Sequence, residues 1–437
     1  MQIITRFLPL LFVLLVYCIR FKRISSSVNF LTLSLCVVFS SVSIISILEY
    51  SKDMIGEFGS TVYLYPTLFF GLYFYLKNNI KISVNINFWS FAFLLLIVCN
   101  HYTKGNVFPA AIYIPLFSVG QLLFYLYTVK KSYSTAHIIE GLYEAFICWT
   151  YLEFLLTLLY PILGVDQVAN LFSSIAQQWS LKREGYVSAV GTYSHPGFLA
   201  YSCAIYSIFF LSCYFNNYRK KSSLLYLLIN CFVIYFTYSR TTFVCFFVIV
   251  GVLYTIYKAK MFSFKYLMYL FSFVIILLVI SYIPSINKLF FHSDSDQMME
   301  SRQIHWLLGL NIWENFKLLG CGINAHVYYM ETHFNKLTAL IVENEFLVSN
   351  PIHNIHIIIL AETGVVGICL WLLYLSKELY YGYKYMLSKN ILNRFCGTIS
   401  FSVLLFLVMY GFFGWVVCNI SILTIVVSLL FLLDFKK

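Results

Sequence analysis

Two histidines and an asparagine stand where an apolar run begins, and they are the first residues of this chain that could do chemistry. His353, Asn354 and His356 open the stretch HNIHIIILAETGVVG, and the run that follows is long enough to cross a bilayer. An imidazole fixed at the mouth of such a helix can act as a general base, with Asn354 or the backbone setting its tautomer. The alternative is an ordinary polar helix end at the membrane surface, and the sequence leaves both interpretations open.

Arginines near other apolar runs offer a complementary chemistry, which is the binding of anions. Arg240, in YFTYSRTTFVCFF, lies at the break between two runs, and a guanidinium can hold phosphate oxygens in a bidentate way. Lys182 and Arg183 come shortly before His195, where another run begins, and cations ahead of a helix N-terminus can form an anion site. Contact with lipid headgroups is the alternative for both places. Arg302, taken alone, would be an ordinary surface arginine.

The run that begins at His353 also carries two glycines and a carboxylate. At helical spacing, His353, Gly364 and Gly367 share one face, so the glycines would let another helix pack closely below the histidine. Glu362 falls on a different face. We expect Glu362 to pair with a hydroxyl or a cation in the helix bundle rather than to take part in the chemistry.

The amino-acid composition of the chain is typical of a membrane protein. Of the 437 residues, 61% are hydrophobic and 11% are charged, whereas soluble proteins carry about 25% charged residues. The cations behind the net charge of +11 lie in short loops between apolar runs, which excludes nucleic-acid binding as their explanation. The sequence therefore predicts an all-α polytopic membrane protein, a single integral membrane domain over residues 1–437, with about 12–13 transmembrane helices.

The expected spans alternate with basic loops, which predicts their sidedness. Basic residues follow the first, third, fifth, seventh, ninth and eleventh spans and should face the cytoplasm. The first span could instead lie on the membrane surface, which would give twelve spans and a cytoplasmic N-terminus. The expected spans are 5–20, 28–48, 60–76, 86–100, 108–129, 138–163, 195–215, 223–239, 241–257, 264–283, 353–374, 396–414 and 416–433.

Two long connections, 164–194 and 284–352, then lie on the outer side. The second contains ESRQIHWLLGLNIWEN, whose helical spacing of Ile304, Leu307, Leu308 and Ile312 predicts a short surface helix. Six of the nine histidines fall between His292 and His356, but their separations are irregular. Asp294 and Asp296, in DSDQ at 294–297, also have a spacing that can bind a divalent cation. We expect no metal site and no other cofactor.

The order of four segments resembles the O-antigen polymerase and O-antigen ligase superfamily. These segments are REGYVSAVGTYSHPGFLA, YSRTTF, SRQIHWLLGLNIWENFKLLGCGIN and HNIHIIILAETGVVG. The spacing from His353–Asn354 to Gly364 and Gly367 matches a signature of that group, as does the large loop before it. The resemblance implies a bacterial multi-pass glycosyltransferase of the GT-C type in the inner membrane. Such an enzyme acts in lipopolysaccharide biosynthesis and transfers a glycan from undecaprenyl diphosphate at the periplasmic face.

The resemblance also implies roles for residues. By position in the motifs, His353 looks like the general base, and Arg183, Arg240 and Arg302 look like clamps on the diphosphate. Further substrate-binding residues are expected at Lys182, His195 and Asn354.

The expected partners are a lipid-linked oligosaccharide donor and acceptor, the bilayer and a chain-length regulator. A polymerase would extend a chain on another lipid-linked repeat unit, and we favour this function. The alternative is a ligase, which would move the chain onto lipid A–core. A flippase or transporter is less favoured because the sequence shows no internal repeat and its intramembrane charges gather on one side.

Overall fold

The structure is a computed structural model that is almost entirely helical in its described part. Within that part, strands are limited to two short antiparallel pairs, β1 (Ile45–Glu49) with β2 (Thr61–Leu64) and β3 (Lys182–Arg183) with β4 (Tyr186–Val187). The predicted all-α class is therefore confirmed. The described residues are 2–40, 45–49, 61–81, 88–103, 106–163, 182–183, 186–193, 195–259, 295–333, 350–415 and 418–434.

The helices follow the apolar runs closely in most of the chain. Those of the first half are α1 (Gln2–Arg20), α2 (Asn29–Phe39), α3 (Pro66–Lys77), α4 (Phe88–Tyr102), α5 (Tyr113–Ser132) and α6 (Thr135–Leu163), with short 3₁₀ helices η1 (Phe21–Arg23) and η2 (Pro109–Ile112). Those of the second half are α9 (Pro196–Phe215), α10 (Lys220–Phe236), α11 (Arg240–Ala259), α14 (Ser295–Asn315), α15 (His326–Thr332), α18 (Ile355–Met386), α19 (Ile391–Gly411) and α20 (Ile420–Leu432).

Six of the described helices are long and apolar enough to cross a membrane, so the chain is a multi-pass membrane protein. They lie at 109–132, 135–159, 196–215, 240–257, 355–386 and 391–411. Three shorter apolar helices lie at 29–39, 88–102 and 420–432. The expected span 264–283 lies outside the described residues.

The bounds predicted for the second and third spans are wrong. Residues 28–48 were expected to be one helix, but α2 ends at Phe39 and residues 45–49 form β1. The expected span 60–76 begins with β2, and its helix starts only at Pro66. The TVYLY stretch at 61–65 is rich in β-branched and aromatic residues, which favours a strand. Proline is then tolerated in the first turn of the helix that follows.

The helix that begins after His353 is also longer than expected. The predicted span ended at residue 374, whereas α18 continues to Met386. Lys377 and Lys384 therefore lie on the last turns of this helix rather than in a loop. Cations near a helix C-terminus interact favourably with its partial negative charge.

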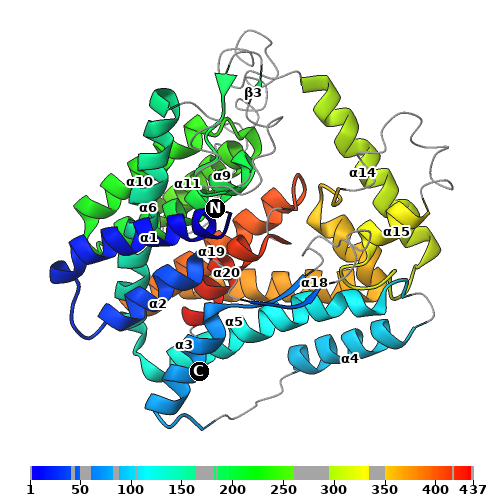
Figure 1. Ribbon diagram of the computed structural model, residues 1–437, viewed down its shortest axis with the longest axis horizontal. Coiled ribbons are helices and arrows are strands. Elements are labelled where there is room, and N and C mark those ends of the chain that lie inside the picture. Colours follow the sequence, from blue (N-terminus) through cyan, green and yellow to red (C-terminus); the bar gives the residue numbers. More distant parts are fainter. Residues whose placement is uncertain are drawn as a thin grey trace.

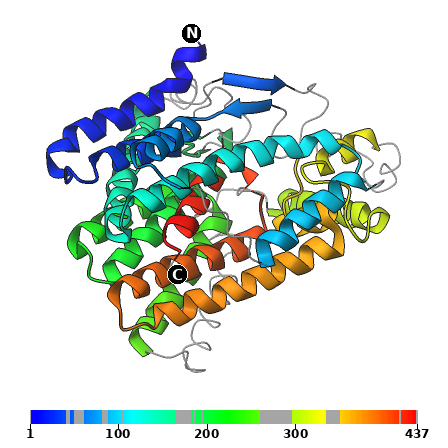
Figure 2. The same ribbon diagram turned by 90° about the horizontal axis from the view of Figure 1, so that it is seen from below.

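Two hydrophobic cores organise the molecule. The larger one unites α1, α2, α3, α5, α6, α9, α10, α11, α19, α20 and the later part of α18. The smaller one joins α14, α15 and residues 321–325 to the first turns of α18. In Figure 1, α14 and α15 lie on the opposite side of the molecule from α1, α6 and α10. Figure 2 shows α4 lying along α18. The start of α18 therefore lies where the two cores meet.

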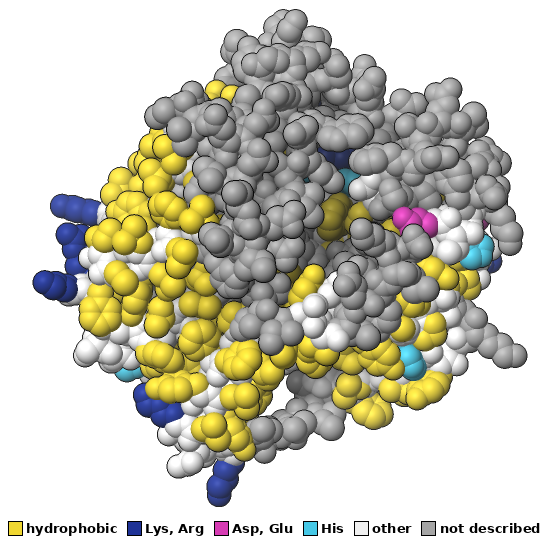
Figure 3. All heavy atoms as spheres, viewed as in Figure 1, with side chains coloured by type: hydrophobic (Ala, Val, Ile, Leu, Met, Phe, Trp, Pro, Cys, Tyr) yellow, Lys and Arg dark blue, Asp and Glu magenta, His cyan; other side chains and the backbone are white. Residues whose placement is uncertain are grey.

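The described surface fits a lipid environment. In Figure 3 hydrophobic side chains cover most of the described surface in view, and lysine and arginine side chains gather at its left and lower margins. Large apolar side chains on α4, α10 and α18, such as Leu95, Leu225, Leu228 and Leu373, are more than half exposed. Such surface is stable in contact with hydrocarbon rather than water.

A buried ionic cluster ties α1 to α6 and α10. The Glu144 carboxylate on α6 is 1% exposed and contacts Nη2 of Arg20 at 2.6 Å and Nη1 of Arg219 at 2.5 Å. Both arginines belong to the basic loops that follow the first and seventh expected spans. Their shared carboxylate offsets the cost of placing charges out of water and holds three segments together.

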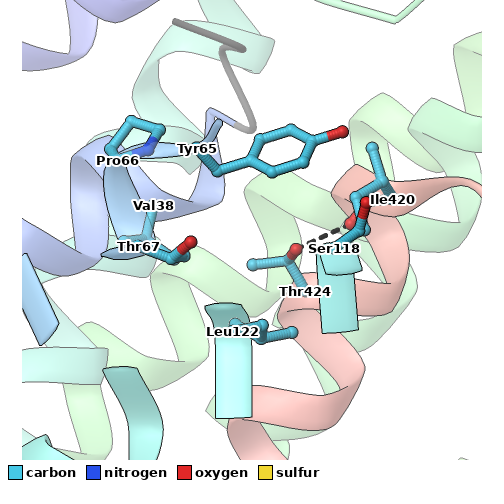
Figure 4. Close-up of a pocket in the computed structure, with 8 residues that line it drawn as sticks. All are labelled: Val38, Tyr65, Pro66, Thr67, Ser118, Leu122, Ile420 and Thr424. Carbon is cyan, nitrogen blue, oxygen red and sulfur yellow. Dashed lines mark hydrogen bonds between the residues drawn. The ribbon is translucent and has the colours of Figure 1, made fainter. Parts of the chain in front are cut away.

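A small cavity where α2, α3, α5 and α20 meet is too small for a substrate. Its lining includes Tyr65, Thr67, Ser118 and Thr424, and the Thr424 hydroxyl donates to the backbone oxygen of Ile420 (Figure 4). Its volume is about 10 Å³, roughly the space of one water molecule. The substrate site must therefore be sought elsewhere.

Candidate active site

The first turn of α18 is fixed by its capping residue. The Asn354 Oδ1 accepts hydrogen bonds from the backbone nitrogens of His356 at 3.0 Å and Ile357 at 3.1 Å. Its Nδ2 donates to the backbone oxygen of Phe412, at 3.2 Å, just beyond the end of α19. These contacts satisfy amides that a helix start leaves unpaired. Asn354 thus caps α18 with its side chain, and its role in substrate binding stays a prediction.

His353 meets a second histidine. Its Nδ1 lies 2.8 Å from Nδ1 of His305, and the two rings are within 9° of parallel with centroids 4.7 Å apart. His305 lies on α14 and is 2% exposed. The sequence analysis did not single it out. The available signal was its position three residues after Arg302, which places both side chains on one face of a helix.

The surroundings of His353 keep its imidazole uncharged. Burial, followed by the nearby charges of His305, Arg302 and His195, lowers the pKa of His353 to about 3. A neutral imidazole has a lone pair that can accept a proton, as a general base requires. The structure therefore brings three predicted site residues (His353, Arg302 and His195) into one neighbourhood.

Among the residues that the structure describes, Arg302 has no anion beside it. Burial lowers the pKa of its guanidinium, while Tyr410 of α19 lies near enough to act in the opposite direction. Within the described residues, Arg302 forms no ion pair and no hydrogen bond. A partly desolvated cation without a partner is unfavourable, so the site is suited to a negatively charged ligand.

Three helices begin close to this point. His195 caps α9, and its Nδ1 accepts from the backbone nitrogen of Gly197 at 3.0 Å, which leaves the ring proton on Nε2. The Tyr410 hydroxyl lies 3.7 Å from where a Cβ on Gly197 would stand, and it lies near Thr242 in the first turn of α11. The starts of α9 and α11 thus adjoin the start of α18. Their partial positive charges add to that of Arg302 and favour an anion.

Arg240 is the first residue of α11 and is half-buried. This places it two residues before Thr242, at the same end of the helix. Lys182 and Arg183 form β3, which pairs with β4, but their side chains lie outside the described part of the chain. Their contact with a substrate therefore stays a prediction.

A buried carboxylate anchors the segment that leads into α9. Glu153 of α6 accepts from the backbone nitrogen of Thr192 at 3.1 Å and from its hydroxyl at 2.5 Å. Gly191 has a φ of +56°, and a Cβ there would stand 1.9 Å from the Glu153 carboxylate. Only glycine fits at this position. The sequence analysis missed Glu153, although a lone carboxylate in an apolar run is a usable signal.

The glycines of α18 do not pack against another helix as predicted. Gly364 interrupts the helix with a φ of +64° and a ψ of −165°, and a Cβ there would stand 2.3 Å from the backbone of Leu318. The polar segment after α14 runs across this break, where the Val365 nitrogen donates to the Lys317 oxygen at 2.9 Å. A Cβ on Gly367 would meet Thr363 of its own helix.

Glu362 pairs with this same segment rather than with the helix bundle. Its Oε1 accepts from the backbone nitrogen of Ala325 at 2.9 Å and from His326, through the backbone nitrogen at 3.3 Å and Nδ1 at 2.9 Å. The Nε2 of His326 in turn accepts from the backbone nitrogen of Ile352 at 3.4 Å. Glu362 therefore holds the start of α15 against α18 and steadies the residue just before His353.

Comparison with protein families places these residues in a known group. Residues 224–372 match the family described as O-antigen ligase. A comparison with curated proteins gave no match. The matched range contains Arg240, Arg302, His305 and His353, which is most of the site built above. This match supports the O-antigen ligase and polymerase superfamily, whose members are glycosyltransferase-like enzymes.

Proposed function

We propose that this protein is an O-antigen polymerase. It transfers a glycan from undecaprenyl diphosphate to a sugar hydroxyl of another lipid-linked repeat unit. One observation carries the proposal: Arg302, which has no anionic partner among the described residues, lies beside the neutral base His353 where three helices begin. A diphosphate leaving group and a sugar hydroxyl are the two reactants that such a pair serves.

The reaction needs charge stabilisation on one side and proton removal on the other. The acceptor oxygen forms a bond to the anomeric carbon, and the bond from that carbon to the diphosphate oxygen breaks with its electron pair. Arg302, Arg240 and the helix N-termini stabilise the developing diphosphate charge. His353 takes the hydroxyl proton, which typically contributes about 10²–10⁴-fold to the rate.

The site faces the periplasm of the inner membrane in this proposal. The helices α9, α11 and α18 all begin at the site, and lysines or arginines lie at or just beyond the far ends of α9 and α18. That distribution supports a cytoplasmic location for the far ends. A reporter enzyme fused at Met330 of α15 should be active only when α15 lies in the periplasm. Activity of a cytoplasm-specific reporter at this position would overturn the proposed orientation.

A ligase is the second candidate, because the family that the chain matches is described by that activity. Its acceptor would be lipid A–core rather than a lipid-linked repeat unit. The match does not support transport. Deletion of the gene, followed by gel analysis of lipopolysaccharide, separates the candidates. A core that carries a single repeat unit supports the polymerase. A bare core with lipid-linked polymer accumulating would instead show a ligase.

A further inference from the structure

The contact between His305 and His353 is a hydrogen bond rather than ring stacking. Non-bonded ring atoms stand about 3.5 Å or more apart, whereas the two Nδ1 atoms are 2.8 Å apart. The nearly parallel rings therefore meet at their edges along an N–H···N bond. Each neutral imidazole has one donor nitrogen and one acceptor nitrogen. One ring must therefore carry its proton on Nδ1 and the other on Nε2.

The backbone next to His353 indicates which ring donates. The carbonyl of Pro351 lies near the His353 ring and favours a protonated nitrogen there, because a carbonyl can only accept. Nδ1 is the ring nitrogen closer to the backbone and lies 2.8 Å from Nδ1 of His305, so we assign the proton to Nδ1 of His353. The Nε2 of His353 is then the nitrogen without a proton.

We propose that His305 is a positioning residue for the transfer reaction, an inference that rests on the proposed function. Its Nδ1 accepts the Nδ1–H of His353 and so presents Nε2 of His353 to the acceptor hydroxyl. When the hydroxyl oxygen attacks the anomeric carbon, its proton passes to this Nε2, and the diphosphate leaves with the electron pair of the broken bond. The positive charge then on His353 is shared with His305 through their hydrogen bond.

The groups around His305 and His353 limit when either imidazole can take up a proton. Arg302 lies on the same helix as His305, His195 lies at the start of α9, and Tyr410 comes from α19. The cation of Arg302 opposes a permanent charge on either ring. A bound diphosphate offsets that cation, so the pair can accept a proton only when the donor is present. This coupling restricts proton transfer to the loaded enzyme.

Two substitutions at His305 test the role in purified protein reconstituted into bilayers. His305→Asn keeps an acceptor oxygen near the place of Nδ1, whereas His305→Leu removes it. We expect His305→Leu to lower kcat by about 10²-fold with KM for the lipid-linked donor unchanged, and His305→Asn to stay within about tenfold of the parent. His137→Asn is the control, because His137 lies three residues before Glu140, which contacts Arg219 just beyond the far end of α9 from the site. A parental kcat in His305→Leu, or equal losses in both variants, would overturn the role.

A second measurement does not depend on turnover. With ¹⁵N-labelled histidine, magnetic resonance of the protein in bilayers at neutral pH should show His353 protonated on Nδ1 and not on Nε2. His305→Leu should change that pattern, and His137→Asn should leave it in place. A proton on Nε2 of His353 in the parent would overturn the positioning role even if transfer is normal. The parent protein could show the expected Nδ1 protonation and yet transfer no glycan from a lipid diphosphate. That result would support the hydrogen-bond geometry and reject the proposed function.

Discussion

We expect Arg302→Gln to slow glycan transfer strongly while leaving folding stability intact. The guanidinium can form two charge-assisted hydrogen bonds to a phosphate group, and together these are worth about 3 kcal/mol. Since about 1.4 kcal/mol corresponds to a factor of ten in rate, the substitution should lower kcat/KM by about 10²-fold. Arg302→Lys keeps the charge but not the paired donors, and we expect it to fall between the parent and Arg302→Gln.

The stability of the empty protein should not suffer from this change. Arg302 is partly desolvated and, among the described residues, has no anion to offset that cost. Removing the charge therefore removes an unfavourable contribution, and the melting temperature should stay level or rise.

Arg20→Gln is the matched control, because it takes a guanidinium from the buried Glu144 carboxylate. Breaking a buried ion pair costs about 3–5 kcal/mol, and we expect the lower figure because Arg219 stays in contact with Glu144.

The two variants should thus show opposite signatures. Transfer is measured in proteoliposomes with a labelled lipid-diphosphate donor, and stability is measured by thermal unfolding in detergent. Arg302→Gln should lose transfer and keep its melting temperature. Arg20→Gln should lose melting temperature and, at a temperature where it is folded, keep transfer. The reasoning fails if Arg302→Gln transfers normally, or if it destabilises the protein as much as Arg20→Gln does.

Four further predictions concern α18 and the segment packed on it. His353→Asn should lower kcat by about 10²–10⁴-fold with donor binding unchanged. Because the pKa of His353 is lowered to about 3, parental kcat/KM should stay level as pH falls from about 8 to about 5, whereas an ordinary histidine base would be half protonated at about 6.5. Glu362→Leu leaves His326 and the start of α15 without their acceptor and should cost about 2–4 kcal/mol, seen as a lower melting temperature and faster proteolysis near α15. Gly364→Ala should cost more than about 3 kcal/mol because its Cβ meets backbone, whereas Gly120→Ala, which meets nothing within 4 Å, should be neutral.

The starts of the helices around the site could be predicted from the sequence. A proline in the first turn marked the start of α9 after His195, and the polar break around Arg240 marked the start of α11. The start of α18 was placed within two residues because His353 and Asn354 precede a continuous apolar run. These signals are local, since capping side chains and proline act on the turn they adjoin.

The partners of the polar residues could not be predicted in the same way. His305, Glu144 and Glu153 each contact residues far away in the chain, and helical periodicity says nothing about which segments meet. The error at Gly364 has the same origin. Its spacing suggested a smooth helix face, but the approach of Leu318 requires a φ that only glycine adopts easily.

The break at Gly364 links the architecture of α18 to the histidine pair. The segment that leaves the end of α14 crosses the break directly, with hydrogen bonds from Cys321 to Ala361 at 2.9 Å and from Val365 to Lys317 at 2.9 Å. The helix that carries His305 is therefore tethered to the helix that begins beside His353.

Gly364 lies ten residues after the cap of α18, about 15 Å along the axis, so it cannot touch the reacting groups. Through the backbone contacts beside it, we expect Gly364 to influence how closely α14 and α18 approach, and hence the distance between the two Nδ1 atoms. A hydrogen bond weakens steeply once its atoms separate beyond about 3.5 Å. A shift of less than 1 Å between α14 and α18 would thus weaken the His305–His353 hydrogen bond and leave the tautomer of His353 unfixed. If the proposed transfer takes place at His353, the broken helix contributes to its geometry although it lies outside the reaction site.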